Sequence, residues 1–98
     1  MIRIWARTTV DGKITRSYIY ESIDNFSEET LYKHLEKICH EIDIPTPLIL
    51  KSHITNYVDF NGSTFLPRDF VESIDFDRFI LENAIILLNA PSNSLIFD

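Results

Sequence analysis

The 98-residue sequence is poor in the residues that build several common kinds of site. It contains one cysteine, Cys39, and two isolated glycines, Gly12 and Gly62. A single cysteine excludes an internal disulfide and a four-thiolate zinc site, and isolated glycines exclude a phosphate-binding glycine-rich loop. The Gly-x-Ser-x-Gly, His-Glu-x-x-His and Cys-x-x-Cys motifs are absent as well. We therefore expect no cofactor, no metal and no familiar catalytic machinery. These absences argue against an enzyme of a familiar kind, but they do not exclude an unfamiliar one.

Long apolar segments are also missing. The most apolar run, residues 84–88, stops at Asn89 and is far shorter than the roughly 20 residues of a membrane helix. The first residues lack a basic stretch followed by roughly seven or more apolar residues, the pattern of a secretory signal. Together with the single cysteine, these features predict a protein of the reducing cytoplasm that spans no membrane.

The overall composition is typical of one small folded domain. Hydrophobic residues make up 45% and charged residues 24% of the chain, which argues against disorder. A chain of this length supports one small core. The formal net charge is -6, but it is uneven. Residues 1–20 hold four basic residues against one acidic residue, a net charge of +3, whereas residues 21–43 hold seven acidic residues against two lysines, a net charge of -5.

Hydrophobic periodicity places two strands at the N-terminus. Residues 2–10 and 13–22 are rich in Ile, Val, Thr, Tyr and Trp. The dipeptide Asp11-Gly12 between them is typical of a tight hairpin turn. The sequence therefore predicts a β-hairpin over residues 2–22, which holds four of the nine basic residues.

Two helices and a third strand are predicted next. Apolar residues recur at helical spacing over residues 28–42, directly after Ser27, a typical N-capping residue. A second helix is predicted from about Ser52, another capping residue, to residue 61. Residues 64–66 have the pattern of a short extended piece, and residues 74–82 that of a strand.

The predicted fold class is α+β, in the order β-β-α-α-β. We expect one small antiparallel or mixed sheet covered by the first helix. Residues 1–82 form a single domain in this prediction. Residues 83–98 form an apolar C-terminal extension that could be an edge strand, a docked tail or a dimer contact. The predicted core consists of Ile4, Leu31, Leu35, Ile38, Ile42, Ile54, Val58, Phe65, Phe70, Ile74 and Phe76.

The hairpin offers one candidate binding face. With a two-residue turn, Ile4 would pair with Ile19 and Trp5 with Tyr18. One face then carries three basic and three aromatic residues: Arg3, Trp5, Arg7, Arg16, Tyr18 and Tyr20. Such a face suits single-stranded nucleic acid, because rings stack on bases and guanidinium groups bind phosphates. The alternative is a core face with arginines along its rim. A bulge at Gly12 would shift the pairing by one residue.

A second candidate is acidic. Asp69, Glu72, Asp75 and Asp77 lie close together in the sequence, and carboxylates two residues apart on a strand share a face. Such a group could hold Mg²⁺ and assist a hydrolase. The alternative is that these are solvated acids on an edge strand, where charge discourages unwanted pairing.

Cysteine and histidine offer a third, weaker candidate. Cys39 and His40 are neighbours on the predicted helix and point about 100° apart, so they do not form a nucleophile and base pair. We expect a structural cysteine and an exposed His40 that shares a face with Glu36. His34 and His53 are expected at the surface.

Three stretches, residues 2–5, 41–47 and 64–77, together resemble a small bacterial family of about this length that has no assigned function. The resemblance covers about residues 2–82. It implies a cytoplasmic bacterial protein, and it implies no catalytic residue.

These observations favour a binding or assembly module without enzymatic activity. A small monomer rarely exposes apolar patches such as residues 85–88, so we expect self-association, for example as a homodimer. Single-stranded nucleic-acid binding and metal-dependent hydrolysis are the alternatives. The sequence identifies no ligand and no other protein partner.

Overall fold

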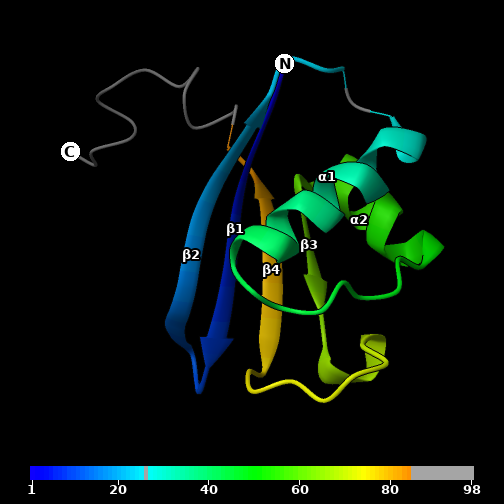
Figure 1. The fold of residues 1–98 in the computed structure, drawn as a ribbon. Helices are drawn as coiled ribbons and strands as arrows, with labels where there is room; N and C mark the ends of the chain where they lie inside the picture. The colour runs from blue at the N-terminus through cyan, green and yellow to red at the C-terminus, as the bar shows by residue number, and fades with distance from the viewer. Residues whose placement is uncertain (26, 85–98) are drawn as a thin grey trace.

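The computed structural model describes residues 1–25 and 27–84, which form a four-stranded antiparallel sheet with two helices (Figure 1). The strands lie side by side in the order β2-β1-β4-β3. The elements in chain order are β1 (Ile2–Val10), β2 (Lys13–Ser22), α1 (Glu28–Glu41), α2 (Lys51–Phe60), β3 (Gly62–Phe65), a 3-10 turn (Pro67–Asp69) and β4 (Arg78–Asn83). The predicted α+β fold is confirmed, and the expected extended piece at residues 64–66 overlaps the end of a further strand, β3, which begins two residues earlier and ends at Phe65.

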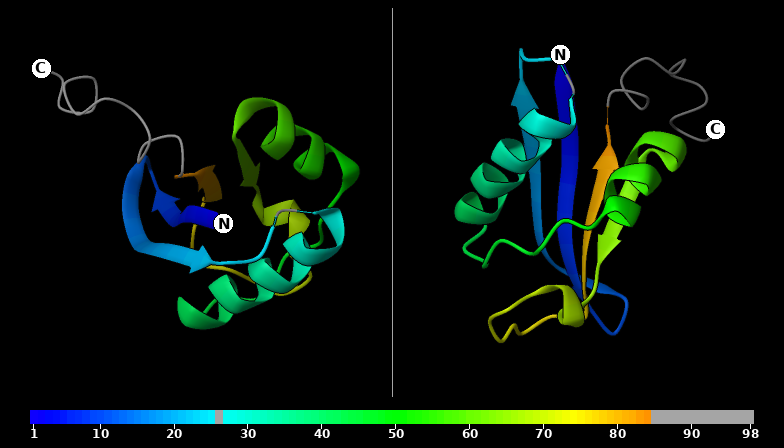
Figure 2. Two further views of the ribbon diagram at one scale, coloured as in Figure 1. Left: turned by 90° about the horizontal axis from the view of Figure 1, so that it is seen from above. Right: turned by 90° about the vertical axis from the view of Figure 1, so that its right-hand side faces the viewer.

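Both helices cover the same face of the sheet. Figure 2 shows α1 in front of β1 and β2, and α2 in front of β3 and β4. The prediction that the first helix covers the sheet is therefore incomplete, because α2 forms the other half of the helical layer. None of the helices in the described residues is long and apolar enough to cross a membrane.

The core fills the space between this layer and the sheet. Its most deeply buried side chains include Ile4 of β1, Phe79 of β4 and Leu35 of α1. Burying such a side chain contributes about 1.5 to 3 kcal/mol. Among the predicted core residues, Ile4, Leu31, Leu35, Ile38, Phe65, Phe70 and Phe76 are buried, whereas Ile42, Ile54 and Ile74 are only half-buried.

Val58 was predicted in the core and is 57% exposed. The inward stripe of α2 consists of His53 and Tyr57 instead of Ile54 and Val58. A hydrogen bond from His53 to Asp69 and the stacking of its ring on Phe65, with 4.2 Å between centroids, fix this rotation of the helix. The first turn also begins earlier than predicted, because Leu50 and not Ser52 is the N-cap residue.

The hairpin turn has the predicted two residues, with φ values of 51° at Asp11 and 80° at Gly12, as a type I′ turn requires. A β-bulge then shifts the register, because Thr15 has no partner on β1. Its hydroxyl is instead 2.8 Å from that of Thr8. Beyond the bulge, Ile4 pairs with Tyr20 and Trp5 with Ile19, so the predicted pairs Ile4 with Ile19 and Trp5 with Tyr18 are wrong.

The last strand is shorter than predicted. β4 begins at Arg78, four residues after the predicted start at residue 74. Residues 74–77 close against the hairpin turn instead, with the Asp77 amide donating to the Thr9 carbonyl at 2.8 Å. Residues 85–98 lie outside the described residues, and so do the three roles predicted for the C-terminal extension.

Candidate binding surface

The face of the sheet opposite the helices is not covered by any described element (Figure 2). We call it the open sheet face. Side chains alternate between the two faces of a strand, and β1 follows this rule with a regular alternation of buried and half-buried residues from Ile2 to Arg7. Through the observed register, the open sheet face is made mainly of Arg3, Trp5, Arg7, Ile14, Ser17, Ile19, Glu21, Arg78, Ile80 and Glu82.

Trp5 lies at the centre of this face and is held by two neighbours. Its indole Nε1 donates a hydrogen bond to the Ser17 hydroxyl at 2.9 Å. The Arg7 guanidinium lies over the indole, 3.9 Å from the ring centroid, which is close enough for a cation–π interaction. Ile19, directly opposite Trp5 on β2, is 44% exposed. The centre is thus a large aromatic side chain in a fixed orientation beside an exposed aliphatic one.

Two ion pairs flank Trp5. Arg3 pairs with Glu21 across β1 and β2, and Arg7 pairs with Glu82 across β1 and β4 at 3.1 Å. Partly exposed pairs of this kind contribute about 0 to 1 kcal/mol each to stability. Their larger effect here is on charge, since Arg3 and Arg7 already have a carboxylate partner. On this face Glu21 of β2 and Glu82 of β4 lie on either side of Arg3 and Arg7 of β1, and Arg78 stands at the start of β4.

The structure divides the predicted basic and aromatic face between the two sides of the sheet. The bulge at Thr15 leaves Tyr18 and Tyr20 on the helix side, opposite Ala6 and Ile4. Tyr20 is buried, and its hydroxyl lies 2.5 Å from His34 Nδ1. Arg3, Trp5 and Arg7 do share one face as predicted. Arg16 does not join them, because its guanidinium binds both carboxylate oxygens of Asp75, at 3.2 and 3.3 Å.

The four predicted acidic residues do not converge. Asp69 is buried, Glu72 is exposed, and Asp77 accepts a hydrogen bond from the Asp11 amide at 2.7 Å. The hydrogen bond from Arg16 lowers the pKa of Asp75 below its usual value. Nowhere in residues 1–25 and 27–84 do three His, Cys, Asp or Glu side chains gather so that they could hold a metal ion. Of the four, Asp75 and Asp77 tie the segment before β4 to the hairpin.

His53 was expected at the surface and is buried beside Asp69. Its Nδ1 accepts a hydrogen bond from the Leu50 amide at 2.9 Å, so Nε2 carries the proton and donates to the Asp69 carboxylate at 3.3 Å. Asp69 also accepts from the Leu66 amide at 2.8 Å. Because both ring nitrogens are engaged, His53 has no nitrogen left to act as a base toward a hydroxyl such as that of the buried Ser63. The cluster fastens α2 to the 3-10 turn.

His34 was also expected at the surface and is only 2% exposed. Its Nε2 has no hydrogen-bond partner among the described residues and lies 3.9 Å from the Asp24 carboxylate. Burial lowers the pKa of His34, and the nearby Asp24 opposes this shift. The sequence did contain a signal, since position 34 belongs to the same helical stripe as Leu31, Leu35 and Ile38.

Cys39 is fully buried, as expected of a structural cysteine. Burial raises the pKa of its thiol to about 12, so the thiolate needed of a nucleophile is scarce at neutral pH. His40 is exposed on another side of α1. Glu36 is exposed as well. These residues do not assemble into a reactive site.

Comparison with known proteins finds no matching family model, no matching curated protein and no matching solved structure. The resemblance of residues 2–82 to a small bacterial family therefore stays a prediction. Any functional conclusion for this chain depends on the geometry of its own surfaces, of which the open sheet face carries the most distinctive chemistry.

Proposed function

We propose that this protein is a non-enzymatic assembly module that binds a second copy of itself through the open sheet face. The observation that carries the proposal is the fixed orientation of Trp5, which is bonded to Ser17 and stacked under Arg7 beside the exposed Ile19. Tryptophan and arginine are the residues most enriched among those that dominate binding energy in protein interfaces. A side chain that is already ordered loses less entropy on binding.

The pattern of charge favours a second copy as the partner. Glu21 of β2 and Glu82 of β4 lie on either side of Arg3 and Arg7 of β1, and Arg78 stands at the start of β4. Two such faces related by a two-fold axis and offset by about one strand, roughly 4.8 Å, would place Arg3 and Arg7 of one copy near a glutamate of the other. The formal net charge of -6 does not lie on this face, which carries Arg3, Arg7 and Arg78 against Glu21 and Glu82.

The size of the face sets the expected strength of association. Strand lengths of 9, 10, 4 and 6 residues give the sheet a projected area of roughly 450 Å². A stable interface usually buries roughly 800 Å² on each partner. We therefore expect a reversible dimer with a micromolar or weaker Kd.

The face is a better candidate than the edge of the sheet. β2 is a long edge strand, but it carries the bulge at Thr15 and begins with Lys13. Bulges and lysines are devices that prevent edge-to-edge pairing. Association through β2 would have to overcome both.

The two other functions have less support. Nucleic-acid binding requires arginines that are free for phosphates, whereas Arg3, Arg7 and Arg16 each pair with a carboxylate. A metal-dependent hydrolase requires carboxylates that converge, and those among the described residues do not.

Sedimentation of the full chain over a wide range of concentrations tests the proposal. Trp5 is the only tryptophan, so its fluorescence reports on the open sheet face directly. We expect a dimer that dissociates on dilution, with a parallel increase in quenching of Trp5 by iodide. The Ile19→Lys variant should stay monomeric at concentrations at which the parent chain is dimeric.

Ile23→Lys provides the matched control. Ile23 is 94% exposed and lies just after β2, so the same substitution there should leave the dimer intact. A chain that is monomeric at millimolar concentration would refute the proposal. A dimer that Ile19→Lys and Ile23→Lys weaken equally would refute the assignment of the interface to the open sheet face.

A further inference from the structure

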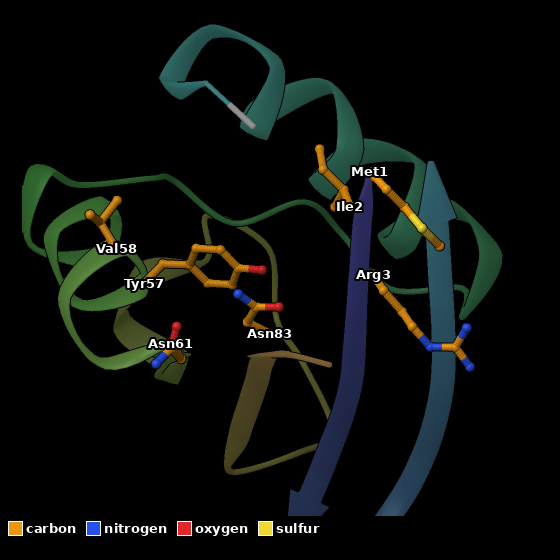
Figure 3. Close-up of a pocket in the computed structure, with 7 residues that line it drawn as sticks. All are labelled: Met1, Ile2, Arg3, Tyr57, Val58, Asn61 and Asn83. Carbon is orange, nitrogen blue, oxygen red and sulfur yellow. The ribbon is translucent and has the colours of Figure 1, made fainter. Parts of the chain in front are cut away.

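Two depressions lie beside the end of β4, one on each side of the sheet. The first is a pocket of about 240 Å³ on the helix side, between the start of β1 and the last turn of α2. Figure 3 shows Tyr57 and Val58 on one side of this pocket and Ile2 on the other, with Asn83, the last residue of β4, between them. The Arg3 side chain points away from the pocket toward β2 (Figure 3).

The second depression lies on the open sheet face, where β3 places Gly62 opposite Glu82 and Thr64 opposite Ile80. It has a volume of about 280 Å³ and is also lined by Phe60, which is 75% exposed. We call it the Gly62 hollow. It is a partly apolar gap at the β3 edge of the face through which we propose that the protein associates.

The gap is built into the pairing of β3 with β4. A Cβ atom added to Gly62 would lie 3.0 Å from the Leu81 carbonyl oxygen, closer than nearly all real contacts of such an atom. Glycine inside a strand often marks a place where another backbone approaches closely. The open sheet face therefore lacks a side chain at position 62.

The register places this gap in the same row of the sheet as Trp5. Ile19 pairs with Trp5, Trp5 with Glu82, and Glu82 with Gly62. The row thus begins on one edge strand with Ile19, which is 44% exposed, and ends on the other edge strand with no side chain. A protrusion and a gap lie at opposite ends of one row.

A two-fold axis that runs parallel to the strands, midway between β1 and β4, exchanges the two ends of this row. It lays β1 of one copy over β4 of the other and β2 over β3, which is the offset of one strand that brings Arg3 and Arg7 near a glutamate. We propose, on the basis of the self-association proposed above, that the Gly62 hollow of each copy receives the Ile19 side chain of the other.

The symmetry and the twist of the sheets are compatible with this contact. A two-fold axis forms the contact twice, so a change in it counts twice in the dimer. Packed sheets usually cross at about 30°, which at this distance from the axis moves Ile19 along β3 by roughly 3 to 4 Å. The hollow is lined from Phe60 to Thr64, and a shift of this size leaves Ile19 within it.

Opposite charges placed on the two sides of the contact test this register. Ile19→Lys should raise the Kd of the dimer in sedimentation, and Thr64→Asp in the same chain should lower it again by about tenfold, because oppositely charged groups in close contact attract strongly. Positions 19 and 64 lie on opposite edges of the sheet, three strand spacings or roughly 14 Å apart. The new charges can therefore pair only between copies.

Asn56→Asp provides the matched control. Asn56 is exposed on α2, on the other side of the sheet, and its substitution returns the same net charge to the Ile19→Lys chain. That double variant should bind as weakly as Ile19→Lys alone. In 1 M salt, where the Debye length is about 3 Å, the advantage of Thr64→Asp over Asn56→Asp should disappear.

A second variant guards against a folding defect on β3. Phe60→Glu changes a side chain that is 75% exposed and lines the same hollow, and it should also restore the dimer of the Ile19→Lys chain. If the parent chain dimerises but neither Thr64→Asp nor Phe60→Glu restores more than Asn56→Asp does, the contact is wrong and self-association stands. A monomeric parent chain would instead refute self-association and the contact together.

Discussion

At the scale of single residues, the two buried histidines differ in how many of their ring nitrogens form hydrogen bonds. His53 has hydrogen bonds on both ring nitrogens, to the Leu50 amide and the Asp69 carboxylate. His34 has one close partner, the Tyr20 hydroxyl, and leaves Nε2 buried without a hydrogen bond among the described residues. A buried imidazole with a vacant nitrogen resists protonation, because the charged form loses its hydration. The burial of His34 in its neutral form should therefore make the stability of the fold depend on pH.

We predict that the protein loses stability as the pH falls below about 6.5, the unperturbed value for histidine. The pKa of His34 is lowered in the folded state, so below that pH the unfolded chain binds a proton that the folded chain does not. The stabilisation is fully present above the unfolded pKa and is lost as the pH falls toward the folded one. Asp24 on one side opposes the shift, and Lys37 on the same helix strengthens it.

Melting temperatures measured between pH 7 and 5.5 check this prediction. In the His34→Gln variant, the dependence of the melting temperature on pH should be weaker than in the parent chain. His40→Gln is the control, since His40 is exposed on the same helix. Equal slopes in the two variants would show that another group causes the pH dependence.

At the scale of elements, the segment before β4 is fastened to the hairpin turn. The Asp77 carboxylate accepts from the Asp11 amide at 2.7 Å, and the Asp77 amide donates to the Thr9 carbonyl at 2.8 Å. These bonds bring a segment that is remote in sequence against a turn whose two residues both have positive φ. The acidic residues of this segment thus act mainly as structural acceptors.

Asp77→Ala should destabilise the protein by about 1 kcal/mol, the usual net value of one hydrogen bond. Glu72→Ala, at an exposed residue of the same segment, should change stability by less. Urea unfolding measures both. If Glu72→Ala costs as much as Asp77→Ala, the carboxylate of Asp77 does not fasten the turn.

Local signals were sufficient to predict most of these elements. The cap at Ser27 and the stripe of Leu31, Leu35 and Ile38 place α1 to within one residue, and Asp11-Gly12 places the turn. The candidate site was less predictable, because it depends on register. One unpaired residue, Thr15, moves Tyr18 and Tyr20 to the opposite side of the sheet, and such a bulge has no strong signature in a single sequence.

The orientation of α2 was missed for a different reason. Apolar spacing favours Ile54 and Val58 as inward residues. In the structure, the hydrogen bond between His53 and Asp69 turns the helix so that His53 faces inward instead. That contact joins residues 16 positions apart and cannot be inferred from helical spacing. Tertiary hydrogen bonds of this kind routinely override a periodic pattern.

At the scale of the whole molecule, the arrangement of strands separates two surfaces. The helical layer buries one face of the sheet, and the open sheet face keeps Trp5 and its ion pairs outside. The pocket at the end of β4 lies at the rim between β1 and α2. Of the residues that line this pocket, only Arg3 also belongs to the open sheet face, so the pocket and the proposed self-association depend on largely different residues.

The strand order also has a consequence for synthesis of the chain. β1 and β4, the first and last strands of the described residues, lie side by side at the centre of the sheet, and contacts this remote in sequence form slowly. A nascent chain can close the β1–β2 hairpin early, but the central ladder must wait for residues 78–83. Measurements of pulling force on stalled ribosomes should show a folding signal only after β4 has emerged. A signal at chain lengths that end after β3 would mean that the sheet gains stable structure before its centre is complete.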